Sequence, residues 1–238
     1  MRSSGYDLRV AQLCALIPDE LHLVVAPLYP LPDSGATMDT STVFASVTEC
    51  PPILGGSPSL RRHLRLDNLH YLRASRPREF ADAQRVLADL MARHHFRRLV
   101  VFGEDLVELV ADIGPCTKVL DVCDSTALSQ SRALEQSSRL RSGHWLGALE
   151  LYRARRTEAR LPTLFAQVTT VSAADSAEIV GLSGITANVF TVPNGVDEAY
   201  LEPMPTAGDR RGVVFWGNLD FAPNADALAY FLDEVWLP

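Results

Sequence analysis

Residues 99–125 read L-V-V-F-G-E-D-L-V-E-L-V-A-D-I-G-P-C-T-K-V-L-D-V-C-D-S and contain two short apolar runs separated by a helical segment. The first run, Leu99–Phe102, ends at a glycine, and the second, Val119–Cys123, ends at Asp124 and Ser125. Neither run alternates apolar with polar residues, which is typical of strands buried on both faces. The stretch therefore predicts a strand–helix–strand unit with parallel strands.

The same alternation of strands and helices continues on both sides of this unit. Further strands are predicted at Leu21–Ala26, near Pro52–Leu54, at Gln167–Val171 and at Asn188–Val192. Helices are predicted at Asp7–Ile17, weakly at Ser41–Glu49, at Glu79–Phe96, at Asp105–Ile113, over Thr126–Phe165 with a break near Ser142, and at Ala173–Val180. This order predicts an α/β fold, a Rossmann-like parallel sheet with helices on both faces.

The polar, proline-rich segment 202–211 predicts a boundary between two domains. Residues 1–207 are expected to form one Rossmann-like domain. Residues 208–238 are expected to begin a second domain, with a strand at Gly212–Trp216 and a helix at Asn224–Trp236.

The composition narrows the class of protein. The chain has 238 residues, 47% of them hydrophobic, and a net charge of −7, which indicates a globular protein and argues against general nucleic-acid binding. Four cysteines occur without a C-x-x-C pair or zinc-ligand spacing, so we expect free thiols, a reducing cytoplasm and no metal. The longest apolar stretch, around Leu21–Leu28, is far too short to span a membrane.

Ligands of open parallel sheets bind at the carboxyl ends of the strands, which directs attention to the residues that follow each predicted strand. Each has a purely structural alternative. Ser172 is expected to cap the helix that follows it, and Asp124 with Ser125 could do the same for the next helix. Asn194 and Gly195 form an ordinary turn pair.

Familiar catalytic signatures are absent from the sequence. No G-x-G-x-x-G follows a strand, and neither a P-loop nor a G-x-S-x-G elbow is present. Arg153, Arg156 and Arg160 share one helix face, which we interpret as a solvated face rather than a phosphate grip.

The last third of the chain resembles a family 4 glycosyltransferase of the GT-B fold, of the bacterial exopolysaccharide type. The resemblance rests on the order of F-A-Q-V-T-T-V-S-A-A-D-S (165–176), V-P-N-G-V-D (192–197) and G-V-V-F-W-G-N-L-D-F-A-P-N-A-D-A (212–227). Residues 4–9, S-G-Y-D-L-R, also resemble the glycine loop and first-helix start of that family, and 121–125 resemble its central acidic segment.

The resemblance implies retaining transfer of a sugar from a nucleotide-sugar to a glycan or lipid-linked acceptor in polysaccharide biosynthesis, without a cofactor or metal. The implied residues are Gly5, Arg9, Gly217 and Asn218 near the donor phosphates, Asp124, Ser125 and Glu104 on the acceptor side, and Asn194, Gly195 and Asp197 at the hinge. It assigns no catalytic residue.

The sequence also departs from the pattern of that family. The glycine loop follows Met1 almost directly, and the Glu-x7-Glu motif of the donor domain does not occur before Pro238. We therefore expect an incomplete chain. The alternatives are a non-catalytic subunit or scaffold half of a split glycosyltransferase, an inactive truncated product, and, least favoured, an unrelated Rossmann-like enzyme. Expected partners are the nucleotide-sugar, the acceptor, and a second copy or a partner chain, with at most peripheral membrane contact.

Overall fold

The computed structural model describes residues 5–28, 43–53, 66–136, 144–196, 212–217, 219 and 222–236. The chain divides into two compact units, 1–195 and 196–238. The boundary expected between residues 207 and 208 falls outside the described residues. Each unit is described by itself below.

The first unit is built on a parallel sheet. Strands β3 (Arg98–Phe102), β4 (Thr117–Cys123), β5 (Gln167–Thr170) and β6 (Val189–Thr191) pair in that order, all parallel. A second parallel pair joins β1 (His22–Val25) to β2 (Ser46–Glu49). The predicted α/β fold with a Rossmann-like parallel sheet is confirmed.

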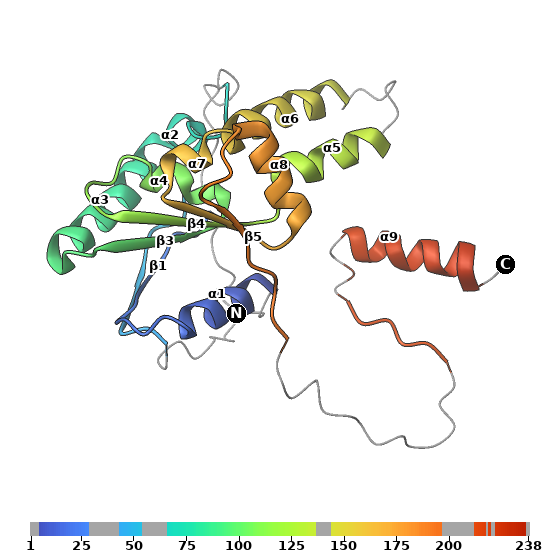
Figure 1. The fold of residues 1–238 in the computed structure, drawn as a ribbon, viewed down its shortest axis with the longest axis horizontal. Helices are drawn as coiled ribbons and strands as arrows, with labels where there is room; N and C mark the ends of the chain where they lie inside the picture. Colours follow the sequence, from blue (N-terminus) through green and yellow to red (C-terminus); the bar gives the residue numbers. More distant parts are fainter. Residues whose placement is uncertain are drawn as a thin grey trace. The chain divides into compact units, whose positions relative to one another are not determined.

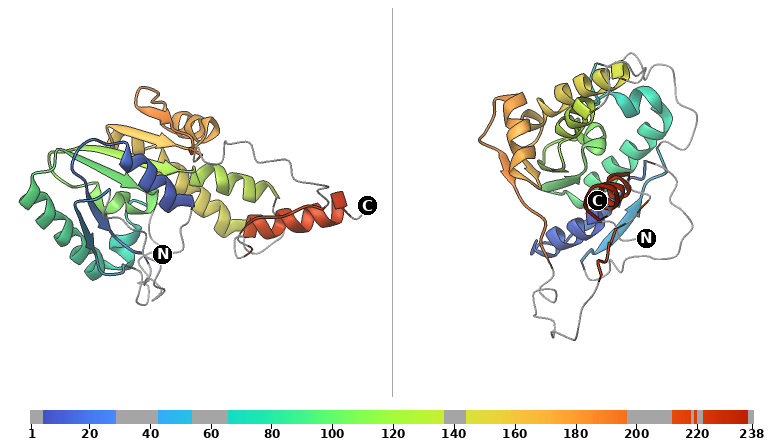
Figure 2. Two further views of the ribbon diagram at one scale, coloured as in Figure 1. Left: turned by 90° about the horizontal axis from the view of Figure 1, so that it is seen from below. Right: turned by 90° about the vertical axis from the view of Figure 1, so that its right-hand side faces the viewer.

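Helices cover both sides of the sheet. They are α1 (Gly5–Ala15), α2 (Tyr71–Ser75), α3 (Pro77–His94), α4 (Val107–Val110), α5 (Thr126–Gln136), α6 (His144–Glu158), α7 (Leu161–Leu164) and α8 (Ala173–Ser183), with a short 3₁₀ turn, η2 (Glu104–Leu106). Figure 1 shows α1 on one side of the sheet and α2, α6 and α7 on the other. In the left view of Figure 2, from below, α1 lies in front of the strands.

The core lies between the sheet and these helices. Leu120 and Val168 stand opposite each other on β4 and β5, and both are fully buried. Helix α3 contributes the buried side chains of Phe80, Ala83, Leu87 and Leu90. These residues are three or four positions apart, so they share one face of the helix.

Two predicted elements of the first unit are wrong, and a third is shorter than predicted. Residues 46–49, expected within a weak helix, form β2, because Ser-Val-Thr-Glu can pair along β1 with alternating burial. The strand expected near Pro52–Leu54 is absent from described residues 51–53, where two prolines cannot donate ladder hydrogen bonds. The helix expected at Asp105–Ile113 is shorter, and consists of η2 followed by α4.

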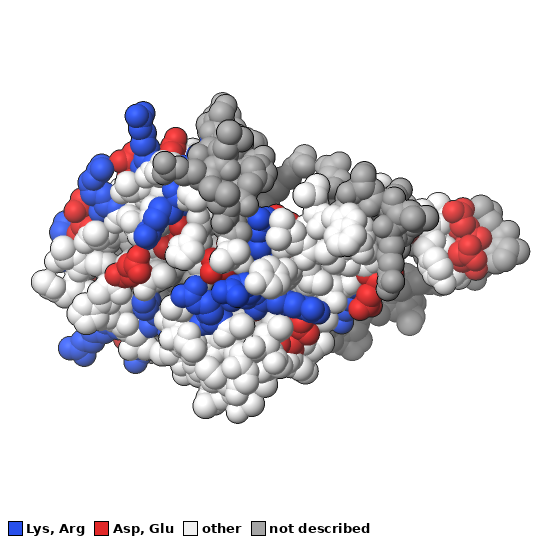
Figure 3. All heavy atoms as spheres, turned by 90° about the horizontal axis from the view of Figure 1, so that it is seen from above, with Lys and Arg blue, Asp and Glu red and all other residues white. Residues whose placement is uncertain are grey.

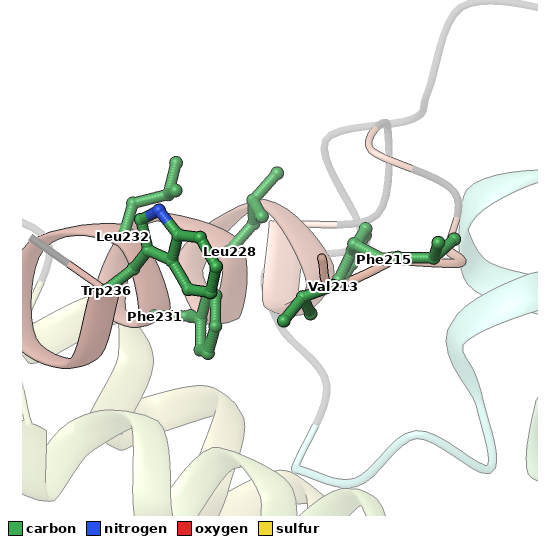
Figure 4. A pocket seen from close by; sticks show the side chains of 7 residues that line it. Val213, Phe215, Leu228, Phe231, Leu232 and Trp236 are labelled. Carbon is green, nitrogen blue, oxygen red and sulfur yellow. The ribbon is translucent and has the colours of Figure 1, made fainter. Parts of the chain in front are cut away.

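The second unit contains one helix and an extended segment. Helix α9 (Ala222–Tyr230) continues as a π-helical segment, η4 (Phe231–Trp236). Residues 213–216 form no strand, so the strand predicted at Gly212–Trp216 is wrong; among described residues of this unit no second strand is present to pair with it. Apolar side chains of both segments, including Phe215, Leu228 and Trp236, line a hollow of about 450 Å³ (Figure 4).

Within the described ranges, no helix combines the length and the apolar character needed to cross a membrane.

Candidate functional site

Polar segments follow all four strands of the larger sheet. Glu104 follows β3, Asp124 and Ser125 follow β4, Ser172 follows β5, and Asn194 follows β6. Because the strands are parallel and adjacent, their carboxyl ends meet at one edge of the sheet, where open α/β folds bind their ligands. The hydrogen bonds that connect these segments define the candidate site.

Arg9 anchors α1 to this edge. Its guanidinium is buried and holds Asp121 of β4 with two bonds, from Nε to Oδ2 at 2.7 Å and from Nη2 to Oδ1 at 2.8 Å. Nη1 donates to Oδ1 of Asn194 at 3.0 Å. The hydroxyl of Thr169 donates to Asp121 as well, at 2.7 Å. Hydrogen bonding to Asp121 raises the pKa of Arg9, while burial opposes the shift.

This arrangement gives Arg9 a structural task. A buried bidentate ion pair is stable only when both partners keep their hydrogen bonds. Here the Asp121 carboxylate accepts two hydrogen bonds from Arg9 and one from the hydroxyl of Thr169. Three nitrogens of the Arg9 guanidinium are already engaged. The donor-phosphate contact expected of Arg9 remains a prediction, and such a contact would have to compete with Asp121 and Asn194.

The end of β4 has an unusual backbone. Cys123 has a φ of 68°, in the left-handed region that favours glycine, and the pairing of β4 with β5 shifts register between Asp121 and Cys123. Such a conformation costs of order 1–3 kcal/mol and occurs often at functional sites. Burial raises the pKa of the Cys123 thiol, and the carboxylates of Asp121 and Asp124 raise it further. The thiol is therefore kept protonated rather than activated.

Ser125 joins three elements. Its backbone N–H donates to Oδ1 of Asp175 at 2.9 Å, and its hydroxyl donates to Oε2 of Glu158 at 2.7 Å. The same hydroxyl accepts the backbone N–H of Leu128 at 3.0 Å, as an N-cap of α5 does. Ser125 is fully buried, so the capping interpretation of this residue is confirmed.

Ser172 caps α8, as the sequence predicts. Its hydroxyl accepts the backbone N–H of Asp175 and also donates to the Asp175 carboxylate. Asp175 therefore receives hydrogen bonds from the segments after β4 and β5 and ties the two together. Thr170, Ser176 and Thr191 extend the polar network toward β6, with hydroxyl separations of 2.7 and 2.8 Å.

Glu158, at the end of α6, is a residue of the strand-end edge that the sequence analysis does not single out. It is fully buried, and its oxygens accept from the Ser125 hydroxyl at 2.7 Å and the Ala127 backbone N–H at 2.9 Å. A signal for it exists in the sequence: with Ala154, Thr157 and Leu161 it follows the spacing of a buried helix face. An acid in such a position requires partners.

Glu104 lies close to Glu158, and its carboxyl group has a strongly raised pKa. Both of its carboxyl oxygens are buried without a hydrogen-bond partner among the described residues. Burial raises its pKa to about 8, the charge of Glu158 adds to the shift, and Thr126 acts in the opposite direction. Burial also raises the pKa of Glu158, against the donors from Ala127 and Ser125. At neutral pH Glu104 is mainly protonated, and it lies beside the hydrogen-bonded carboxyl group of Glu158.

The remaining predicted site residues are spread over the two units. Gly5 begins α1, and Asp124, Asn194 and Gly195 are exposed at the strand-end edge. Gly217 is exposed in the second unit. Asp197 and Asn218 lie outside the described residues.

The arginine row on α6 is not a uniformly solvated face, and that interpretation is wrong for one member. Arg153 is buried and donates to Glu150 at 2.7 Å. Arg156 is exposed and lies against the Tyr152 ring, while Arg160 pairs with Asp67 at 3.2 Å.

Carboxyl, amide and hydroxyl groups line the strand-end edge. Among the described residues, no group of three or more His, Cys, Asp and Glu side chains could hold a metal ion. Asp124 and Asn194 are exposed and offer hydrogen-bonding groups, on a scaffold fixed by Arg9 and Ser125, whereas the carboxyl oxygens of Glu104 are buried. The fold is that of a Rossmann-like α/β protein with a polar edge at the carboxyl ends of its strands. Comparison with protein-family models, with curated proteins and with solved structures finds no match.

Proposed function

We propose that the first unit is the acceptor-side domain of a glycosyltransferase of the GT-B type, which moves a sugar from a nucleotide-sugar to a glycan or lipid-linked acceptor. The proposal starts from the ordered motifs at 165–176, 192–197 and 212–227. A parallel sheet with helices on both sides is compatible with it but hosts many other functions.

The observation that carries the proposal is the joining of the strand ends by one buried network. Arg9 links α1 to β4 and to Asn194, and Asp175 links the segments after β4 and β5. The network occupies the buried polar groups of Arg9, Asp121 and Asp175 and leaves Asp124 and Asn194 exposed at the rim. A rigid edge with exposed hydrogen-bonding groups suits a sugar, which is bound through its hydroxyls.

The acidic groups support the acceptor side in particular. Glu104 and Glu158 lie together, with Asp105 near Glu104 and Glu178 near Glu158. A cluster of carboxyl groups offers no positive charge to a phosphate, so it fits a neutral acceptor better than a nucleotide diphosphate. We further propose a reducing compartment such as the cytoplasm, because all four cysteines are free thiols.

Chemical-shift mapping tests the proposal. UDP-glucose and GDP-mannose serve as donor probes, and short neutral oligosaccharides serve as acceptor probes. The expected result is a saturable shift of the amides of Asp124, Ser125 and Asn194 with an oligosaccharide, weakened in Asp124→Ala. The matched control is Asp82→Ala on α3, another acid with a half-exposed side chain. Absence of a saturable shift with every donor and acceptor would overturn the proposal.

A second candidate function is a non-catalytic subunit or scaffold of such an enzyme. One observation favours it: Arg9, expected near the donor phosphates, is fully engaged by Asp121 and Asn194. The same titration separates the two candidates. Binding of an oligosaccharide without any response to a nucleotide-sugar, and without transfer in a coupled assay, favours the scaffold.

A further inference from the structure

Helix α6 carries an exposed apolar stripe on the face opposite its buried residues. Trp145, Leu149 and Tyr152 are spaced four and three residues apart, so they share one face of the helix, and they are 79%, 41% and 48% exposed. Leu146, beside them, is 68% exposed. Soluble proteins rarely leave neighbouring large apolar side chains uncovered without a binding partner.

The buried side of α6 is already occupied by the rest of the first unit. Ala154, Thr157 and Glu158 are fully buried, and Glu158 bonds to the start of α5. The described core of the first unit therefore packs against the other face of α6 and does not cover the stripe. It is a second surface, separate from the strand-end edge.

The charge beside the stripe is positive. Arg155 and Arg156 are exposed at its carboxyl-terminal end, and Arg156 lies along Tyr152, with its guanidinium carbon 5.8 Å from the ring centre. The acid nearest in sequence, Glu150, is paired with Arg153 at 2.7 Å. Helix α5, which packs on α6, adds one exposed cation, Arg132, and one exposed acid, Glu135. Figure 3 shows one face of the molecule, on which Lys and Arg side chains form a row with both uncharged and acidic surface beside it.

We propose that this stripe of α6 (Trp145, Leu146, Leu149 and Tyr152, with Arg155 and Arg156) docks on an anionic lipid surface. Tryptophan and tyrosine favour the membrane interface because one end of each ring is apolar and the other polar. Leucine adds apolar area, and arginine pairs with anionic headgroups. The chain as a whole carries a net charge of −7, so attraction to a negative surface has to come from the local positive charge of Arg155 and Arg156.

A second copy of the chain fits the stripe less well. A symmetric dimer through this face would set two copies of the same positively charged patch against each other, because a two-fold interface uses the same surface on both subunits. Like charges opposite one another oppose such an association. The lipid surface removes this conflict, since its headgroups carry the opposite charge.

Vesicle co-sedimentation of the full chain tests the proposal. Vesicles of phosphatidylglycerol with phosphatidylcholine are compared with vesicles of phosphatidylcholine alone. We expect salt-sensitive binding to the anionic vesicles and little binding to the neutral ones. The double variant Trp145→Ser with Leu149→Ser is expected to lower the partition coefficient at least about tenfold, since each substitution removes apolar area that the lipid would bury. Arg155→Gln and Arg156→Gln are each expected to lower it about fivefold, from about 1 kcal/mol per arginine.

Matched variants distinguish this stripe from general stickiness and from misfolding. Leu16→Ser with Leu66→Ser removes two leucines that are 79% and 65% exposed elsewhere, and Arg78→Gln with Arg97→Gln removes two exposed arginines. These controls are expected to bind as the unchanged chain does. All variants change exposed side chains, so urea unfolding is expected to give unchanged midpoints.

A second measurement reports on Trp145 itself. Changing Trp216 and Trp236 to phenylalanine leaves Trp145 as the sole tryptophan, and its emission is expected to shift to the blue on addition of anionic vesicles. Failure of the unchanged chain to bind anionic vesicles would overturn the proposal, as would equal binding by the stripe and control variants. A concentration-dependent dimer that Trp145→Ser abolishes, without vesicle binding, would assign the stripe to self-association instead.

Discussion

The ion pair between Arg9 and Asp121 is expected to contribute strongly to the free energy of unfolding. Both are buried, and the bidentate pair joins α1 to β4. Arg9→Met leaves the Asp121 carboxylate buried without its cation, which is expected to cost about 3–5 kcal/mol of unfolding free energy. Urea unfolding measures this loss, with Arg132→Met on the surface of α5 as the control.

The double variant Arg9→Met with Asp121→Leu tests the reason for that loss. It removes both charges, so it is expected to be more stable than Arg9→Met alone. A loss below about 1 kcal/mol in Arg9→Met would contradict a buried, uncompensated carboxylate.

Glu104 predicts a dependence of stability on pH. Its pKa is raised from 4.5 to about 8 on folding, so the folded state holds this proton more tightly than the unfolded state does. Glu104 therefore lowers the free energy of unfolding as the pH rises. The loss begins at about pH 4.5 and is complete above about pH 8.

Glu104→Gln removes this titration and keeps the side-chain shape. Relative to the unchanged chain it is expected to gain stability as pH rises, by about 3–5 kcal/mol at pH 9, since each pKa unit corresponds to about 1.4 kcal/mol. Thermal unfolding at a series of pH values measures the difference, with exposed Glu135→Gln as the control. Parallel pH profiles for Glu104→Gln and the unchanged chain would show that Glu104 is not protonated in the fold.

At the scale of elements, Ser125 and Glu158 connect α5 to α6. Ser125→Ala removes the N-cap of α5 and one hydrogen bond to a buried carboxylate. We expect a loss of about 1–3 kcal/mol of unfolding free energy. Glu158→Gln alone is expected to weaken the same bond. The double variant is expected to lose less unfolding free energy than the sum of the losses in the two single variants, because both remove the same contact. A loss equal to that sum would show that the contact contributes no coupling energy.

At the scale of the whole molecule, the two units differ in burial. The first has fully buried side chains in its sheet and helices, among them Leu120, Val168 and Ile179. In the second, none of the described residues is buried, and Val214 and Trp216 are 88% and 96% exposed. A segment with one helix and no sheet cannot bury a core of its own.

Hydrogen exchange is expected to reflect this difference. The amides of residues 213–216 should exchange with little protection, because they form no described strand and cover little apolar area. Those of Leu120 and Val122 in β4 should be protected near the level of global unfolding. Strong protection of residues 213–216 would show instead that this segment has a partner.

The sequence predicts most of the fold and part of the site. The sheet strands follow from apolar runs, and the cap at Ser172 follows from its position before a helix. The strand at 46–49 does not, because local preference there is weak and pairing with β1 decides it. Glu158 was missed because its partners, Ser125 and Ala127, come from another helix start.

By itself, the sequence determines the class of this protein: alternating apolar runs and amphipathic helices commit it to a parallel α/β sheet, because each run can bury itself only between two helix layers. The tertiary structure decides what each polar residue does. It alone turns Arg9 into an anchor for Asp121 and isolates Glu104 beside Glu158. It alone also leaves the α6 stripe uncovered. The reason is physical: hydrogen bonding and burial depend on neighbours in space, and those neighbours lie far apart along the chain.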